Sequence, residues 1–571
     1  MCFSSRLLRH ASIIAVNVTV CVNGVQAQQA PDAGQIQRQI ERSLPSPTTG
    51  APTPATPDAA PVDQSGPLVR ISTFVVEGAT LIPTDELVAT FEQYRGEQMY
   101  LGELRNVAQK LVGVYRERGW FVRVVLPEQD ISGGTLRIIV IEGRFGELID
   151  KSGKTRANTD FVNRIVGTHL EAGQPYSLAQ LERGLLLAND LPGIQADGVL
   201  QAGKSPGTTD LAVIVADGPR AGLALGANNF GNRYTGKVQS SGVLGINNLT
   251  GYGDQLTGSL LMAERMDYQG AGYSFPLGTS GLRARVDVNQ LHYRLGKDFE
   301  DLDVKGKARS LRAGLSYPLV RATDRNIWVS LDYSRRRTFD EALGFTLRER
   351  EVNSYGLSLY GDAQDAWGRG GQTRWRVELI GGEADLRHAP ERRQDAVTAK
   401  VDGGFARLST DLQRDQVIAA GTYARARLNA QVTGDNLESS QQFSLGGPFG
   451  VRGYPQNEGT GDMGAVLQLE LHSLMPWTGI NNLDGFVFAD AGLVRQRKNT
   501  WTGWNASGSQ RNNYALYSAG LGMNWRHPVG FAIEAIVAVP LGGNAGSNRT
   551  DLNQDGSRER PQVWINLSQV F

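Results

Sequence analysis

One arginine lies in a glycine-rich segment late in the chain, where a charged side chain could form an ion pair. Arg452 belongs to residues 446–454, GGPFGVRGY, a sequence that predicts neither a helix nor a regular strand. Asp490 lies downstream in residues 486–492, FVFADAG, whose alternation predicts a strand. A guanidinium can hold a carboxylate through two parallel hydrogen bonds. The two segments therefore predict a loop fastened to a strand by an ion pair.

The region around both segments, residues 219–571, alternates apolar and polar residues over long stretches. Leu282, Ala284, Val286 and Val288 alternate with Arg283, Arg285, Asp287 and Asn289, and the period recurs within 327–333, 375–379, 424–432, 467–471, 519–525 and 563–567. Strands with one apolar and one charged face are typical of a membrane barrel with a wet lumen. We expect a mainly β fold whose C-terminal barrel has about 16 strands, at about 22 residues per strand and connection.

A soluble β-sandwich would alternate in the same way, but its core would then contain paired arginines. Beyond the N-terminal region there is no run of about 18 apolar residues, so the sequence predicts no transmembrane helix. The 58 basic and 58 acidic residues balance, which argues against nucleic acid as the main partner.

Residues 1–27 have the three parts of a secretory signal peptide. Arg6 and Arg9 precede an apolar run over 11–22, and residues 25–27, VQA, form a small-x-small cleavage site. A membrane anchor is the alternative, but the run is too short and too polar to span. Cleavage would remove both cysteines of the chain and, with them, any disulfide or cysteine-based site.

Residues 28–44 predict a short helix with a narrow apolar stripe. Ile36, Ile40 and Leu44 recur every fourth residue, and the positions around them are polar. Such a helix could plug a water-filled channel or could be a frayed terminus, and the sequence leaves both open. Residues 45–67 are rich in proline, alanine and threonine and predict an extended linker.

Residues 68–143 and 144–218 predict two small α+β modules with one shared element order. Each runs strand, helix, helix, strand, strand, which makes an internal repeat with helices on one face of a sheet. In the second module, Leu178, Leu181 and Leu185 mark the expected buried side of the second helix. The open sheet edges of such modules suit an extended peptide, which can add as a further strand.

The sequence contains no pattern that predicts catalysis or metal binding. Its six histidines lack metal-ligand spacing, and no nucleophile elbow, P-loop or dinucleotide fingerprint occurs. Residues 551–556, DLNQDG, resemble the start of a calcium loop, but the twelfth position is Gln562 where a glutamate is needed. We therefore expect no enzyme activity, no metal site and no cofactor.

These features resemble the TpsB family, the outer-membrane transporters of two-partner secretion that export haemolysins and filamentous adhesins. The resemblance covers nearly the whole chain after the signal peptide. Its two motifs are V-R-G-Y, at Val451, Arg452, Gly453 and Tyr454, and F-x-D-x-G, at Phe488, Asp490 and Gly492. Each motif alone is short and is weak evidence for the family. Both motifs in this order, after two such modules, are strong evidence. In that family the modules are polypeptide-transport-associated (POTRA) domains, and the barrel has 16 strands.

The resemblance implies an outer-membrane pore that binds an unfolded exoprotein through periplasmic POTRA domains and exports it to the cell surface. The implied partners are a β-helical TpsA-type exoprotein and outer-membrane lipid, without nucleic acid or a small-molecule substrate, for a monomeric pore. Arg452 and Asp490 would anchor a lumenal loop to the barrel wall. The alternative is an exposed pair worth under about 1 kcal/mol. Two other functions stay open, a barrel-assembly factor of the same superfamily and a passive porin.

Overall fold

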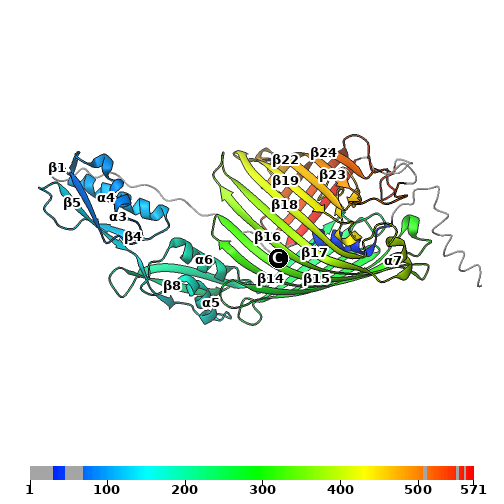
Figure 1. Cartoon of the computed structure of the whole chain (residues 1–571), viewed down its shortest axis with the longest axis horizontal. Helices are drawn as coiled ribbons and strands as arrows, with labels where there is room; N and C mark the ends of the chain where they lie inside the picture. The colour runs from blue at the N-terminus through cyan, green and yellow to red at the C-terminus, as the bar shows by residue number, and fades with distance from the viewer. Residues whose placement is uncertain (1–29, 46–67, 506–510, 548–551, 559–560) are drawn as a thin grey trace, which may run out of the picture.

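The structure is a computed structural model that describes residues 30–45, 68–505, 511–547, 552–558 and 561–571. The predicted signal peptide, and all of the predicted linker except its first residue, lie outside the described residues. Two small modules stand at one end of an elongated molecule and a barrel forms the other end (Figure 1). Within the described ranges no helix is long and apolar enough to cross a membrane.

Sixteen antiparallel strands of the described chain form a closed barrel, which confirms the predicted fold class. β26 pairs with β9 to close the cylinder. The strands are β9 (Ala221–Asn228), β10 (Gln239–Asn247), β11 (Gln255–Ala263), β12 (Met266–Pro276), β13 (Arg283–Arg294), β14 (Lys305–Arg321), β15 (Arg325–Ala342), β16 (Phe345–Asp365), β17 (Gly371–Leu386), β18 (Gly403–Ala419), β19 (Thr422–Thr433), β22 (Met463–Leu474), β23 (Leu483–Arg495), β24 (Asn513–Arg526), β25 (Phe531–Pro540) and β26 (Gln562–Val570).

The alternating sequence sorts side chains onto the two faces of this wall. Leu331 of β15 and Leu357 of β16 are register partners on the outer face, and about half of each side chain is exposed. Ser330 and Asp332 point the other way and share a hydrogen bond of 3.2 Å. Closure gives every strand two neighbours, so backbone groups are paired in a membrane that offers no water.

The first module, residues 68–143, is a three-stranded sheet with two helices. Its sheet has the order β2-β5-β4, with β2 parallel to β5, and a separate β1-β3 pair lies beside it. The elements are β1 (Leu68–Arg70), β2 (Thr73–Glu77), α3 (Thr84–Ala89), η1 (Glu92–Tyr94), β3 (Gln98–Tyr100), α4 (Leu101–Glu117), β4 (Val122–Val125) and β5 (Thr135–Glu142).

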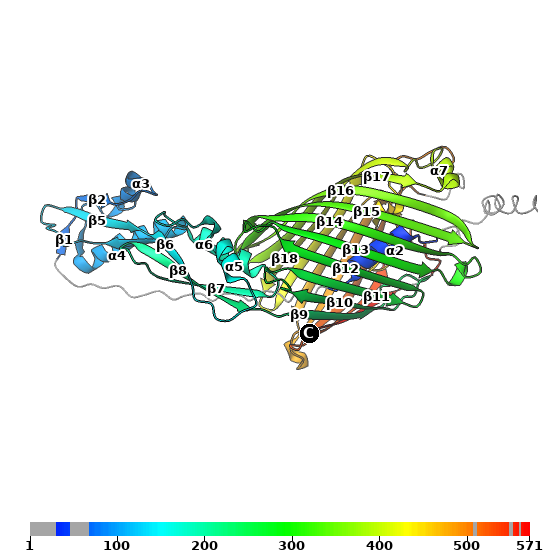
Figure 2. The same ribbon diagram turned by 90° about the horizontal axis from the view of Figure 1, so that it is seen from below.

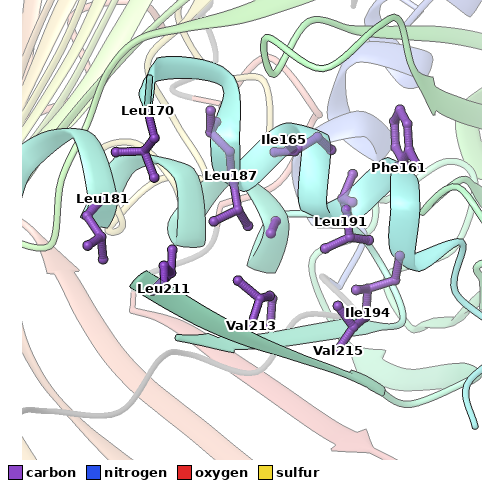
Figure 3. Packing of buried hydrophobic residues seen from close by; sticks show 14 of the residues in the cluster. Phe161, Ile165, Leu170, Leu181, Leu187, Leu191, Ile194, Leu211, Val213 and Val215 are labelled. Carbon is purple, nitrogen blue, oxygen red and sulfur yellow. The ribbon is translucent and has the colours of Figure 1, made fainter. Parts of the chain in front are cut away.

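The second module repeats this plan with the sheet order β6-β8-β7. Its elements are β6 (Arg144–Asp150), α5 (Thr159–Val166), η2 (Gly167–His169), α6 (Leu178–Asn189), β7 (Ile194–Ala202) and β8 (Thr208–Asp217). Leu181 and Leu187 of α6 pack towards Leu211 and Val213 of β8 in one core (Figure 3). Leu178 was expected in that core but is 51% exposed, because it is the first residue of the helix and precedes the buried face.

The second module is joined to the turn between β14 and β15. Arg321 forms an ion pair of 2.8 Å with Asp190 at the end of α6. Arg183 also donates a 2.7 Å hydrogen bond to the carbonyl oxygen of Pro318. These contacts identify the barrel end that carries β14's last residues as the end next to the modules.

Glu142 organises the first module from the last position of β5. Its carboxylate accepts hydrogen bonds from the backbone N–H groups of Thr80 and Leu81, both at 2.8 Å, and from the Tyr115 hydroxyl at 2.9 Å. Burial raises the pKa of Glu142, but these hydrogen bonds outweigh it and leave the pKa below the ordinary value of 4.5. The carboxylate thus ties the loop before α3 and helix α4 to the sheet.

We predict that Glu142→Gln destabilises the first module by about 1–3 kcal/mol, because an amide NH2 in place of the second carboxylate oxygen cannot accept the hydrogen bond that the Thr80 hydroxyl donates there. Since the folded pKa is lowered, the stabilisation in the native protein is full above about pH 4.5 and is lost as the pH falls through the folded value. Thermal unfolding of the two modules in the full chain would show both effects. Glu92→Gln, which removes an exposed partner of Arg95, is the control. Equal unfolding temperatures of Glu142→Gln and Glu92→Gln would contradict the stabilising role assigned to Glu142.

Candidate functional site in the barrel lumen

The predicted motif loop connects β19 to β22 and folds back inside the barrel. A short hairpin of β20 (Phe443–Ser444) and β21 (Thr460–Gly461) forms its base, after η4 (Ser439–Gln441). Val451 and Tyr454 are buried in a cluster with Val466 and Leu516 of the wall. The loop therefore packs its apolar side chains on the inner face of β22–β24.

Arg452 is held between two carboxylates of the wall. Its Nε and Nη2 atoms donate to the two Asp490 oxygens at 3.0 and 2.6 Å, which is the expected bidentate pair. Its Nη1 donates to Glu470 at 2.5 Å. Arg452 and Asp490 are each only 3% exposed. Removing one partner of such a buried pair leaves an uncompensated charge and typically costs about 3–5 kcal/mol, so the exposed-pair alternative does not describe this geometry.

Other groups hold both partners in place. Asp490 accepts from the backbone N–H of Arg452 at 3.0 Å and from the Ser518 hydroxyl at 2.9 Å. The guanidinium lies 3.6 Å from the ring centroid of Phe488, in cation–π geometry. Trp564 of β26 donates to the carbonyl oxygen of Arg452 at 2.8 Å. The loop tip is thus fixed by strands β22, β23, β24 and β26 together.

Two motif glycines allow the loop to approach the wall this closely. A Cβ atom on Gly453 would lie 2.8 Å from the backbone nitrogen of Pro540 and 2.7 Å from the Ser518 Cβ atom. A Cβ atom on Gly492 would lie 2.6 Å from a methyl group of Val451. Both distances are shorter than real Cβ contacts, so a larger residue at either position must displace the loop.

The predicted plug helix is α2 (Ala33–Ser43), and it lies inside the barrel against β13–β15 (Figure 2). It is shorter than the predicted 28–44. Asp32 is its N-cap residue, and the Asp32 carboxylate accepts a hydrogen bond from the backbone N–H of Gln35. Ile36 and Ile40 are fully buried among wall residues that include Tyr268 and Leu291, and Leu44, just beyond the helix, is half-buried at the edge of this cluster. Gln37 and Gln39 of the helix are also buried, which a frayed terminus would not show.

Arg350 of β16 connects the helix to the motif loop. Its guanidinium binds Asp32 at 3.2 Å, Glu438 next to η4 at 2.8 Å and Glu391 of α7 (Ala389–Asp395) at 2.6 Å. The helix also touches η4 directly, since a Cβ atom on Gly34 would lie 2.9 Å from the Ser440 Cβ atom. One arginine therefore joins the start of the helix, the base of the loop and the connection between β17 and β18.

A second set of contacts holds the other end of α2. Glu41 forms a 2.9 Å ion pair with Arg336, and Gln37 donates to the Ser310 hydroxyl at 2.9 Å. A cavity of about 600 Å³ remains beside the helix, and four of the arginines that line it are Arg38, Arg42, Arg336 and Arg407. The lumen is thus polar and strongly basic next to the helix.

Sequence reasoning missed two of these groups. Glu470 lies on the lumenal side of β22, as the outward leucines at 467, 469 and 471 could have indicated, because alternate residues share a face. Arg350 had no such signal, since its three acidic partners are far away in the chain. The structure brings together all predicted motif residues, and within its described ranges no group of three or more His, Cys, Asp or Glu could hold a metal ion.

The comparisons with known proteins agree with this architecture. Residues 207–524 match the model of the haemolysin secretion/activation protein family ShlB/FhaC/HecB, and residues 69–143 match a ShlB-type POTRA domain. The chain is 27% identical to the heme/hemopexin transporter protein HuxB of Haemophilus influenzae, over 98% of this chain and 99% of that protein. It is 26% identical to the outer membrane transporter CdiB of Escherichia coli, over 78% of this chain and 75% of that protein.

Solved structures show the same fold. The structure of CdiB from Escherichia coli covers 100% of both chains with a TM-score of 0.67 at 20% identity, and that of CdiB from Acinetobacter baumannii does so with a TM-score of 0.59 at 16% identity. The fold and the site thus define an outer-membrane protein-secretion pore. The chain belongs to the haemolysin secretion/activation family, and it is an outer-membrane transporter of the two-partner secretion class.

We predict that Gly453→Ala displaces the motif loop and lowers export of the secreted partner strongly, because the added methyl group meets the Pro540 backbone. Gly434→Ala is the matched control, since no atom lies within 4 Å of its Cβ position. Export is measured as partner protein in the culture medium relative to the cell pellet. Normal export by Gly453→Ala, with the pore present in the outer membrane, would contradict the close packing.

Proposed function

We propose that this transporter takes up one exoprotein in its unfolded state from the periplasm and passes it outward through its own monomeric barrel. The exoprotein is of the type that forms a β-helix once it has folded. The ion pair of Arg452 with Asp490, buried in the lumen, carries this proposal. A pore for small solutes needs no loop held in place by two carboxylates. The proposed role is transport and includes no covalent step, cofactor, metal ion or nucleic acid, and the partners are the exoprotein and outer-membrane lipid.

The proposed receptor consists of both modules, residues 68–143 and 144–218, each taken as a POTRA domain. In the second module β7 is an edge strand of its sheet, and Val199 and Leu200 on it are 54% and 38% exposed. An extended chain can add to such an edge through main-chain hydrogen bonds and cover these side chains. This supports capture of an unfolded partner by strand addition.

The proposed function of the motif loop is to shape the path of the exoprotein along β22–β24. The contacts of Arg452 with Asp490 and Glu470, here called the Arg452 clamp, fix the loop tip to the wall. In the absence of a nucleotide motif in the sequence, folding of the partner outside the cell would supply the driving force.

The proposed function of α2 is to close the resting pore and to leave when the exoprotein arrives. Its apolar face is short, and ion pairs and side-chain hydrogen bonds make up the remaining contacts. The partly exposed carboxylate of Glu41 can exchange its bond with Arg336 for water or for a passing chain at low cost. Residues 45–67, proposed as a linker, would give the helix the length it needs to withdraw.

Replacing the clamp arginine tests the function. We predict that Arg452→Ala abolishes export while the barrel still inserts, because the loop loses its anchor and Asp490 and Glu470 lose their shared cation. The measurement is partner protein in the medium, with heat-modifiable gel migration as the test of barrel folding. Arg285→Ala is the control, since Arg285 pairs with Asp287 on its own strand. Undiminished export by Arg452→Ala would remove the proposed role of the motif.

Loosening the helix tests the plug. Deletion of residues 28–44 is expected to raise ion conductance across planar lipid bilayers, and Arg350→Gln is expected to raise the frequency of large openings. In that variant three carboxylates lose their common partner and repel one another. Arg285→Gln removes a lumenal charge away from the helix and should leave conductance near the native level. If neither change alters conductance, α2 does not close the pore.

A further inference from the structure

The outer wall of the barrel carries a groove of about 610 Å³ across β12, β13, β14 and β15. Ala271, Val288 and Leu311 are register neighbours along it and form an apolar floor. Three arginines, Arg309, Arg335 and Arg337, line it from β14 and β15, and no carboxylate is among the described residues that line it. An apolar floor beside clustered guanidinium groups suits an amphiphile with an anionic head.

The groove opens away from the lumen. Val288 and Leu311 are 51% and 40% exposed. Their chain neighbours Asn289 and Ser310 point inward, where they share a hydrogen bond of 3.3 Å and where Ser310 also binds Gln37 of the plug helix. Successive residues of a strand lie on opposite faces, so the arginines of the groove face the membrane and not the pore.

The strand register gives the depth of the arginines. Arg309 pairs with Arg337, and Leu311 pairs with Arg335. The next outward-facing row towards the periplasm contains the partners Tyr333 and Tyr355, and the row after that contains outward leucines such as Leu331. Aromatic rings of this kind mark the membrane–water interface and leucines mark the hydrocarbon. The periplasmic modules contact the opposite end of these strands, so the arginines lie at the headgroup level of the outer leaflet.

Glu351 holds the guanidinium groups of Arg335 and Arg337 in place through ion pairs. This carboxylate is 4% exposed and accepts from Arg335 at 2.8 Å, from Arg337 at 2.5 Å and from Arg387 at 2.8 Å. One buried negative charge therefore orients three cations and leaves positive charge in excess. The side chains of Arg335 and Arg337 remain 41% and 55% exposed, and Arg309 forms no ion pair within the described chain. Planar forks of this type bind phosphate oxygens in pairs.

We propose that this groove binds a phosphorylated glycolipid of the lipid A type from the outer leaflet. Its phosphate would lie on Arg309, Arg335 and Arg337, and one acyl chain would lie over Ala271, Val288 and Leu311. The lipid would brace β12–β15, the strands whose inner face contacts the plug helix. The chemistry that selects the lipid is the pairing of a phosphate with three arginines directly above an apolar floor.

The double variant Arg309→Gln with Arg337→Gln tests the site. Native mass spectrometry of the full chain, extracted in mild detergent, should show co-purifying lipid A falling by at least about tenfold, because two phosphate contacts are lost. Added lipid A should raise the thermal unfolding midpoint of the native protein and should not raise that of the variant. Heat-modifiable gel migration confirms that the variant is folded. Arg309→Lys keeps the positive charge and removes the planar guanidinium, so it separates the effect of geometry from the effect of charge.

Arg392→Gln with Arg393→Gln is the matched control. It removes two exposed arginines from α7, at the same end of the barrel and outside the groove. This control should keep the native amount of lipid A and the native thermal shift. Equal lipid A in both double variants would overturn the site. An equal thermal shift with phosphatidylglycerol vesicles at matched charge would overturn the glycolipid and show attraction to anionic lipid in general.

Discussion

A buried arginine between two carboxylates determines how the lumen of this barrel is organised. Arg452 spans Asp490 and Glu470 and lies on the ring of Phe488. Because all three charged groups are removed from bulk water, the arrangement is stable only when it is complete. It fixes the loop tip to one wall and leaves the opposite wall, β13–β15, for the helix. The lumen is thus divided into a loop side and a helix side.

The two lumenal elements are also connected to each other. Arg350 binds Asp32 at the start of α2 and Glu438 at the base of the loop, and Gly34 lies against Ser440. In our proposal, a helix that leaves the pore releases the base of the loop, whereas Arg452 keeps the loop tip on the wall. The proposed opening would thus leave the loop tip, which we propose shapes the path of the exoprotein, in place on the opposite wall.

The wall serves two environments with one alternating sequence. On β14, Ser310 faces the pore and binds the plug helix, while Arg309 and Leu311 face the membrane. The same strands therefore contact α2 inside the barrel and, in our proposal, hold a phosphorylated lipid outside. Stability of the barrel and closure of the pore are thus expected to respond together to the lipid around it.

Local patterns in the sequence were sufficient for the architecture. The alternation of apolar and polar residues indicated the barrel, because it places one face of each strand towards lipid and the other towards water. The glycines and charges around Arg452 and Asp490 indicated the anchored loop. The spacing of Ile36 and Ile40 gave the apolar face of the helix but not its location, because a polar helix is equally compatible with solvent and with a wet pore. Glu470, Arg350 and the outer arginine groove depended on tertiary structure. Their partners are brought together only when sixteen strands take one register and the cylinder closes, and distant pairings of that kind leave no periodic signal in a single chain.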